Sequence, residues 1–269
     1  MRVRRRGPRR RTRIAAVAAA AIAIAALAQG LPTVTVTRAE RTIVVAQLTT
    51  GADGARTVLA NRNCEEGVLT NVFFGPVAGY VETRFDETLL LSQIAVVRVP
   101  RAESEDDETV ELYGGAATFD RPGCLADVDA SDARPVELRQ GRTTILGARF
   151  FLDRGTDVAT FDGPVSLERA AAEGDDRPPL QATADSMTFD VETEQATLLG
   201  AVVVTSGTRV SSADRLELDE AAGVALLSGA PAVSRRGADE VRGSTLRYDL
   251  ETDEVVAKGA VFATFEIAD

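Results

Sequence analysis

The sequence predicts an all-β chain of stacked two-strand repeats, preceded by an N-terminal export segment. Three observations lead to this class. An aspartate and a glycine ten residues apart recur four times, at Asp153/Gly163, Asp190/Gly200, Asp219/Gly229 and Asp249/Gly259. Apolar and polar residues alternate around each pair, which is the period of a half-buried strand. Helix-forming runs are scarce beyond the N-terminus, so the recurring interval indicates a repeat architecture of strands.

The first 28 residues have the layout of a secretory signal peptide. A basic block ends at Arg13, an apolar run covers residues 14–28, and this run closes on Ala26-Leu27-Ala28. The run has about 15 residues, fewer than the ~20 of a membrane-spanning helix, which favours cleavage after Ala28. We therefore expect a periplasmic chain, with an inner-membrane anchor helix as the alternative if the segment is not cleaved.

The rest of the chain is strongly acidic. Residues 1–28 hold eight arginines and no acid, so residues 29–269 carry 22 basic and 41 acidic side chains, a formal charge of −19. Such a surface repels nucleic acid, and no nucleic-acid partner is expected. The acidic stretches at 103–108 and 173–179 are expected to be solvated loops, because neither has the ligand spacing of a calcium loop. We expect no cofactor and no metal site.

Cys64 and Cys124 are the only cysteines, and an exported chain with one pair most simply forms one disulfide. Closing a loop of about 60 residues would stabilise the fold by at most roughly 4 kcal/mol in chain-entropy estimates. A reactive thiol is the alternative, but the chain contains no histidine to serve as its base.

Each repeat unit is expected to be two strands joined by a polar turn, and the units recur after 37, 29 and 30 residues. The aspartate is suited to a strand end, where its carboxylate accepts hydrogen bonds from turn amides. The glycine suggests a bend, because the apolar row continues across it without changing face. A fifth, degenerate copy is expected around Asp120.

The apolar residues of each unit share one face of their strands, and stacked units would enclose a continuous interior. The same alternation serves a packed core or a lipid-holding groove. In the third unit the row runs through Pro231 and Val233. The candidate groove residues are Phe150, Leu152, Phe161, Val165, Met187, Phe189, Leu198, Val202, Val204, Leu216, Leu218, Leu227, Val233, Leu246, Tyr248 and Val261.

These repeats resemble the OstA-like or LptA family of periplasmic lipopolysaccharide-transport proteins, over about residues 140–267. The shared pattern is Ala-Asp, a hydrophobic pair followed by Asp, a hairpin, and Gly followed by Val. It occurs from Ala184-Asp185 to Asp190 with Gly200-Ala201-Val202, from Ala213-Asp214 to Asp219 with Gly229, and from Leu246 to Asp249 with Gly259-Ala260-Val261. The resemblance implies an open β-jellyroll bent like a taco shell, whose groove shields acyl chains. It also implies head-to-tail strand pairing with related jellyrolls.

We expect three parts: a signal or anchor at 1–28, an N-terminal β region at 29–139 continuous with the jellyroll, and OstA-like repeats at 140–269. The expected function is non-enzymatic lipid binding or bridging toward the outer membrane. The expected partners are lipopolysaccharide or another envelope lipid, related jellyroll proteins, and further copies of this chain. Six arginines could meet lipid phosphates or serve solubility alone: Arg209, Arg215, Arg235, Arg236, Arg242 and Arg247.

Two other functions compete with lipid binding. A β-solenoid-like scaffold or filament would use the same apolar rows, although the 37-residue interval fits a constant rung length poorly. An enzyme could use Asp214 with Asp219, or Asp185 with Asp190, as a carboxylate pair. Because these aspartates recur in register with the repeat, a turn role explains them better, and no catalytic residue is expected.

Overall fold

The computed structural model describes residues 23–24, 33–38, 41–47, 57–61, 64–74, 80–85, 87–100, 108–121, 124–130, 133–171, 178–190, 193, 195–219, 221–250, 252 and 254–265. Every regular element among them is a β-strand, which confirms the all-β prediction. The predicted signal or anchor helix lies outside the described residues, except for the two-residue strand β1 (Ala23–Ile24). In the described part of the chain, no helix has the length and apolarity to cross a membrane.

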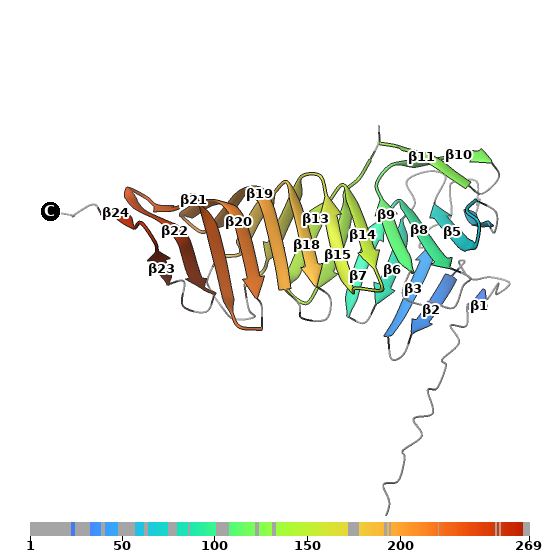
Figure 1. Cartoon of the computed structure of the whole chain (residues 1–269), viewed down its shortest axis with the longest axis horizontal. Helices are drawn as coiled ribbons and strands as arrows, with labels where there is room; N and C mark the ends of the chain where they lie inside the picture. The colour runs from blue at the N-terminus through green and yellow to red at the C-terminus, as the bar shows by residue number, and fades with distance from the viewer. Residues whose placement is uncertain are drawn as a thin grey trace, which may run out of the picture.

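The strands form an antiparallel sheet that is folded along a bend into two facing walls (Figure 1). Wall 1 contains, in spatial order, β4 (Thr57–Asn61), β5 (Val68–Phe74), β8 (Ile94–Pro100), β9 (Thr109–Tyr113), β14 (Arg149–Asp153), β15 (Val158–Asp162), β18 (Ser186–Asp190), one half each of β19 to β22, and β23 (Val255–Lys258). Wall 2 contains β1, β2 (Thr33–Arg38), β3 (Arg41–Gln47), β6 (Val81–Phe85), β7 (Thr88–Ser92), β12 (Val136–Gln140), β13 (Thr143–Gly147), β16 (Val165–Arg169), β17 (Leu180–Ala184), the other halves of β19 to β22, and β24 (Phe262–Thr264).

Four long strands cross from one wall to the other: β19 (Gln195–Ser206), β20 (Arg209–Asp219), β21 (Val224–Arg236) and β22 (Asp239–Asp249). In β19, Leu199 pairs with Arg215 in wall 1 and Val202 pairs with Ala213 in wall 2. Gly200, between these pairs, has a positive φ of 78°. The predicted bend is therefore present at this glycine, and it interrupts the ladder. Leu198 and Val202 are both buried, so the apolar row keeps its face across the bend.

The third unit bends differently and corrects one part of the predicted row. Ser228 pairs with Thr245 and Ala232 pairs with Gly243, so three residues of β21 stand opposite the single Ser244. Unequal numbers of residues between two paired positions shift the alternation of side chains. Ala232 and Ser234 are buried as a result, whereas Pro231 is exposed and Val233 is half-buried. The inward placement expected for Pro231 and Val233 was wrong.

The inward faces of both walls form one hydrophobic cluster that extends from Val45 in β3 to Tyr248 in β22. Pairing of β7 with β12 and of β9 with β14 joins the N-terminal strands to the repeats, so the cluster is continuous across this junction. This is the two-walled jellyroll that the family resemblance implies, and most of its interior is packed with apolar side chains.

A hairpin of β10 (Ala116–Arg121) and β11 (Cys124–Asp129) forms a separate two-stranded sheet beside wall 1 (Figure 1). Its apolar side chains, with Phe74 and Tyr113, pack against the small cluster of Val72, Ile94 and Val96. The rings of Phe119 and Phe74 are 5.1 Å apart between centroids. Asp120 belongs to this hairpin, so the fifth repeat copy expected around it was wrong.

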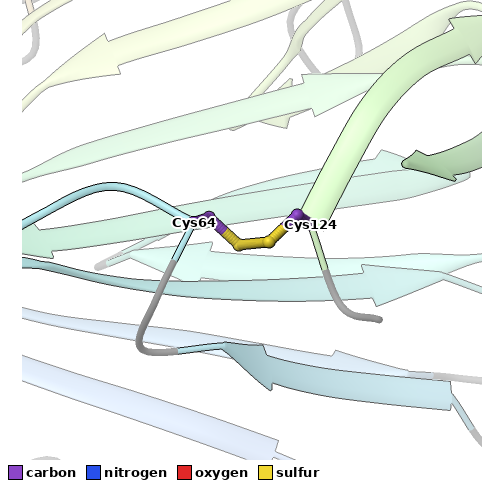
Figure 2. Close-up of a disulfide and its surroundings, with 2 residues drawn as sticks. All are labelled: Cys64 and Cys124. Atoms are coloured by element: carbon purple, nitrogen blue, oxygen red, sulfur yellow. A yellow bond between two sulfur atoms is a disulfide. The ribbon is translucent and has the colours of Figure 1, made fainter. Parts of the chain in front are cut away.

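The predicted disulfide is confirmed and fixes this hairpin to the segment before β5. Cys64 and Cys124 are bonded, with their Cα atoms 5.4 Å apart (Figure 2). Cys124 is the first residue of β11, so the bond holds the start of that strand.

Candidate functional site

The interior between the walls collects most of the predicted groove residues. Fourteen of the sixteen are buried members of the single large cluster: Phe150, Leu152, Phe161, Val165, Met187, Phe189, Leu198, Val202, Val204, Leu216, Leu218, Leu227, Leu246 and Tyr248. Val233 is displaced by the bend described above, and Val261 is 52% exposed. Val261 lies between β23 and β24, the last described strands, where no further described strand covers it.

The side of the walls opposite the bend, here called the mouth, contains two cavities. The first has a volume of about 340 Å³, and the second has about 260 Å³. Arg142 borders both cavities. Apolar residues of the first are Leu180, Val204, Tyr248 and Leu250, and those of the second are Leu138, Ile145, Leu167, Phe189, Ala196 and Leu218. Space therefore reaches the apolar interior from the mouth, although the deeper part of the row is packed.

Along the wall 1 side of the mouth, the repeated aspartates cap their own turns. The Oδ1 atoms of Asp153, Asp190, Asp219 and Asp249 accept hydrogen bonds of 2.7–2.9 Å from the backbone N–H groups of Gly155, Thr193, Ala222 and Thr252 respectively. This confirms the turn role inferred from their register in the repeat.

The proposed carboxylate pairs are not brought together. Asp214 lies at the bend, where its Oδ2 accepts from Ala230 N, and Asp219 lies at the mouth end of the same half-strand. Five residues of extended chain separate them by about 16 Å, well beyond the roughly 5–9.5 Å of glycosidase carboxylate pairs. Asp185 and Asp190 are likewise five residues apart, so they are too distant to act as a pair. Over the described ranges, no group of three or more potential metal ligands is present.

Arginines line the wall 2 side of the mouth. Arg142, Arg169, Arg209 and Arg236 all border the first cavity, and the guanidinium of Arg209 lies 5.7 Å from the centroid of the Tyr248 ring. Arg142 and Arg169 were missed by the sequence analysis. Arg169 was detectable, because it follows the inward residue Leu167 at the period-2 spacing of a strand.

Other predicted arginines have different surroundings. Arg215 forms an ion pair with Glu217 at 2.7 Å, and Arg235 and Arg242 both pair with Glu240. The hydrogen bonds from Arg242 and Arg235 lower the pKa of the Glu240 carboxyl. These three arginines are exposed and do not border the mouth cavities. Arg247 lies between the buried Leu246 and Tyr248 of β22, so it belongs to the outer face.

The central repeats match a known protein family. Residues 135–224 match the family described as "LptA/(LptD N-terminal domain) LPS transport protein". The resemblance to the LptA family is confirmed for this segment. It spans β12 to the first residue of β21, and so includes strands of both walls and the residues bordering the second cavity from Leu138 onward.

One solved structure with a similar chain is LptH, "the LptA homologous periplasmic component of the conserved lipopolysaccharide transport device from Pseudomonas aeruginosa". The two chains share 13% identity over 67% of this chain and 95% of LptH, with a TM-score of 0.33. No curated protein matches the chain.

Proposed function

We propose that this chain is a non-enzymatic lipid-binding protein of the cell envelope, which shields acyl chains of lipopolysaccharide or a related glycolipid between its walls. The observation that carries the proposal is the continuous inward apolar row, to which two cavities give access at the mouth. The match of residues 135–224 to a family described as an LPS transport protein supports it.

The length of the row suits an acyl chain. Six inter-strand spacings separate β14 from β22 in wall 1, which at about 4.8 Å each makes a row of about 29 Å. A bilayer core of about 30 Å contains two opposed acyl layers, so one chain can lie along this row completely. Each methylene taken from water contributes about 0.8 kcal/mol. Because the deeper row is packed, binding requires the walls to separate at the mouth.

We further propose that the chain acts in the periplasm, as its N-terminal sequence pattern indicates. Its C-terminal strands suit pairing with related jellyroll proteins or with another copy of this chain. Val256, Val261, Phe262 and Phe265 are 48–65% exposed at this end of the sheet. Exposed edge strands with apolar side chains are templates for addition of a further strand.

Two neighbouring leucines provide a direct test of lipid shielding. Leu198 is fully buried in the interior, whereas Leu199 is 38% exposed on the opposite face of the same strand. A photo-reactive amino acid at position 198 should form adducts with added lipopolysaccharide, and the same group at position 199 should not. Equal adduct yields at both positions, or none at either, would contradict the proposal. Mass spectrometry of lipid extracted with the purified protein would identify the natural cargo.

The packed interior also supports a second candidate, a structural scaffold in which the apolar rows only hold the walls together. In that case the protein would assemble through its end strands without binding lipid. Sedimentation with and without added lipid separates the two functions, because only a lipid carrier changes its mass by bound lipid.

A further inference from the structure

The first mouth cavity has a charge opposite to that of the protein as a whole. The chain has a formal net charge of −11, yet among the described residues that line the cavity four are arginines and one, Asp249, is acidic. Local cationic excess in a concave site attracts anions even when the total charge is negative. On the outer face, by contrast, the arginines Arg215, Arg235 and Arg242 lie beside glutamates.

The backbone itself gathers these arginines. Arg209 and Arg236 are direct cross-strand partners in β20 and β21, and both border the cavity. Like charges at directly opposed positions of an antiparallel pair destabilise it. Arg142 lies in the β12–β13 turn of the same wall, where its Nη1 donates to the carbonyl of Ala170 at 3.3 Å. Arg169, Arg209 and Arg236 make further interactions in this structure, so a ligand would exchange partners with them.

The floor of the cavity is apolar and leads into the interior. Leu180 and Val204 lie below the arginines, and Val204 belongs to the buried inward row. A ligand matching this arrangement has an anionic group attached to hydrocarbon. Arginine presents a planar fork of donors that suits two oxygens of one phosphate, which favours phosphate as the anionic group.

We propose that Arg142, Arg169, Arg209 and Arg236 form a binding site for the phosphate-bearing head group of a lipid, whose acyl chain enters the interior beside Val204. This inference rests on the proposed lipid-binding function and adds the head-group chemistry that selects the lipid. Because hydrogen bonds between arginine and phosphate join charged groups, loss of two arginines should weaken binding of the phosphate-bearing lipid by at least about tenfold.

The test compares phosphatidic acid with diacylglycerol of identical chains, by displacement of a fluorescent fatty-acid probe. The wild-type protein should bind phosphatidic acid at least about tenfold more tightly, and added salt should reduce this preference. The double variant Arg209→Gln/Arg236→Gln should lose most of the preference and keep its affinity for diacylglycerol. The control Arg215→Gln/Arg242→Gln removes two outer-face arginines and should behave as wild type.

Each contrary outcome has a definite meaning. If the wild type binds both lipids equally, the head-group site is wrong while lipid shielding stands, and this comparison needs no variant to fold. If neither lipid binds, both proposals fail. If inorganic phosphate binds as tightly as phosphatidic acid, the cavity is a site for a free anion and the lipid assignment is overturned.

Discussion

The hydroxyl of Tyr248 donates a 2.8 Å hydrogen bond to Oγ of Ser234, and this bond ties wall 1 to wall 2 close to the mouth. Ser211, also on wall 2, is hydrogen-bonded to the same hydroxyl, and all three side chains are buried. Tyr248 and the residue paired with Ser234, Val241, are seven residues apart in β22. Only a strand folded back at the bend can bring Tyr248 to Ser234. The hydrogen bond therefore forms only while the two walls face each other at this distance.

Replacing Tyr248 with phenylalanine should lower the free energy of unfolding by about 1–3 kcal/mol, because two buried serine hydroxyls lose their shared partner. Urea denaturation measures this. Adding Ser211→Ala and Ser234→Ala to the Tyr248→Phe variant should cost less than the same serine changes in the wild type, as expected for coupled residues. Additive costs would show that the three hydroxyls do not act together.

Gly163 lies at the bend between β15 and β16, and adding a methyl group there should strongly lower the stability of the fold. This glycine has a φ of 83°, and a Cβ placed on it would lie 2.8 Å from Cβ of Ala148. Gly163→Ala should destabilise the fold by roughly 2–4 kcal/mol, from left-handed backbone strain plus overpacking. The matched control is Gly237→Ala, since Gly237 has a φ of 61° and open space around its Cβ position. The Gly237→Ala variant should lose only about 1–2 kcal/mol of unfolding free energy in the same urea titration. Equal losses would mean that contact at the bend has no cost.

The capping aspartates predict different results for two substitutions at one site. Asp219→Ala removes the acceptor for Ala222 N and should lower stability by about 1 kcal/mol. Asp219→Asn keeps a side-chain oxygen in the same place and should stay within about 0.5 kcal/mol of wild type. Thermal or urea unfolding of both variants checks this. A large loss in the asparagine variant would indicate that the negative charge itself is needed.

Local sequence patterns predicted the repeats well because the relevant interactions are local. The Asp-to-turn hydrogen bonds span two or three residues, and the inward position of Leu198 or Leu216 follows from alternation within one strand. Cys64 and Cys124 could be paired because the chain offers no other cysteine.

The parts that sequence did not predict depend on pairing between distant strands. The number of residues left unpaired at a bend is set by both strands, so Gly229-Ala230-Pro231 gave no sign that Val233 would turn outward. The arginines of the first cavity are far apart in the sequence. Arg142 and Arg209 border the same cavity because the strands of wall 2 pair side by side. Likewise, alternation around Asp120 did not reveal that β10 pairs with β11 in a sheet separate from the other described strands.

Asn71 provides a last prediction, which concerns the N-terminal part of the interior. It is fully buried in β5, two residues from the inward Phe73, and among the described residues neither polar atom of its amide has a hydrogen-bond partner. A buried, unpaired polar group costs about 1–3 kcal/mol, so Asn71→Val should raise the free energy of unfolding by up to that amount. Thr188→Val, on the exposed face of β18, is the control and should change stability by less than about 0.5 kcal/mol. If Asn71→Val instead lowers the urea midpoint, the amide is hydrogen-bonded in solution, and its partner should be sought among the lipids that the interior binds.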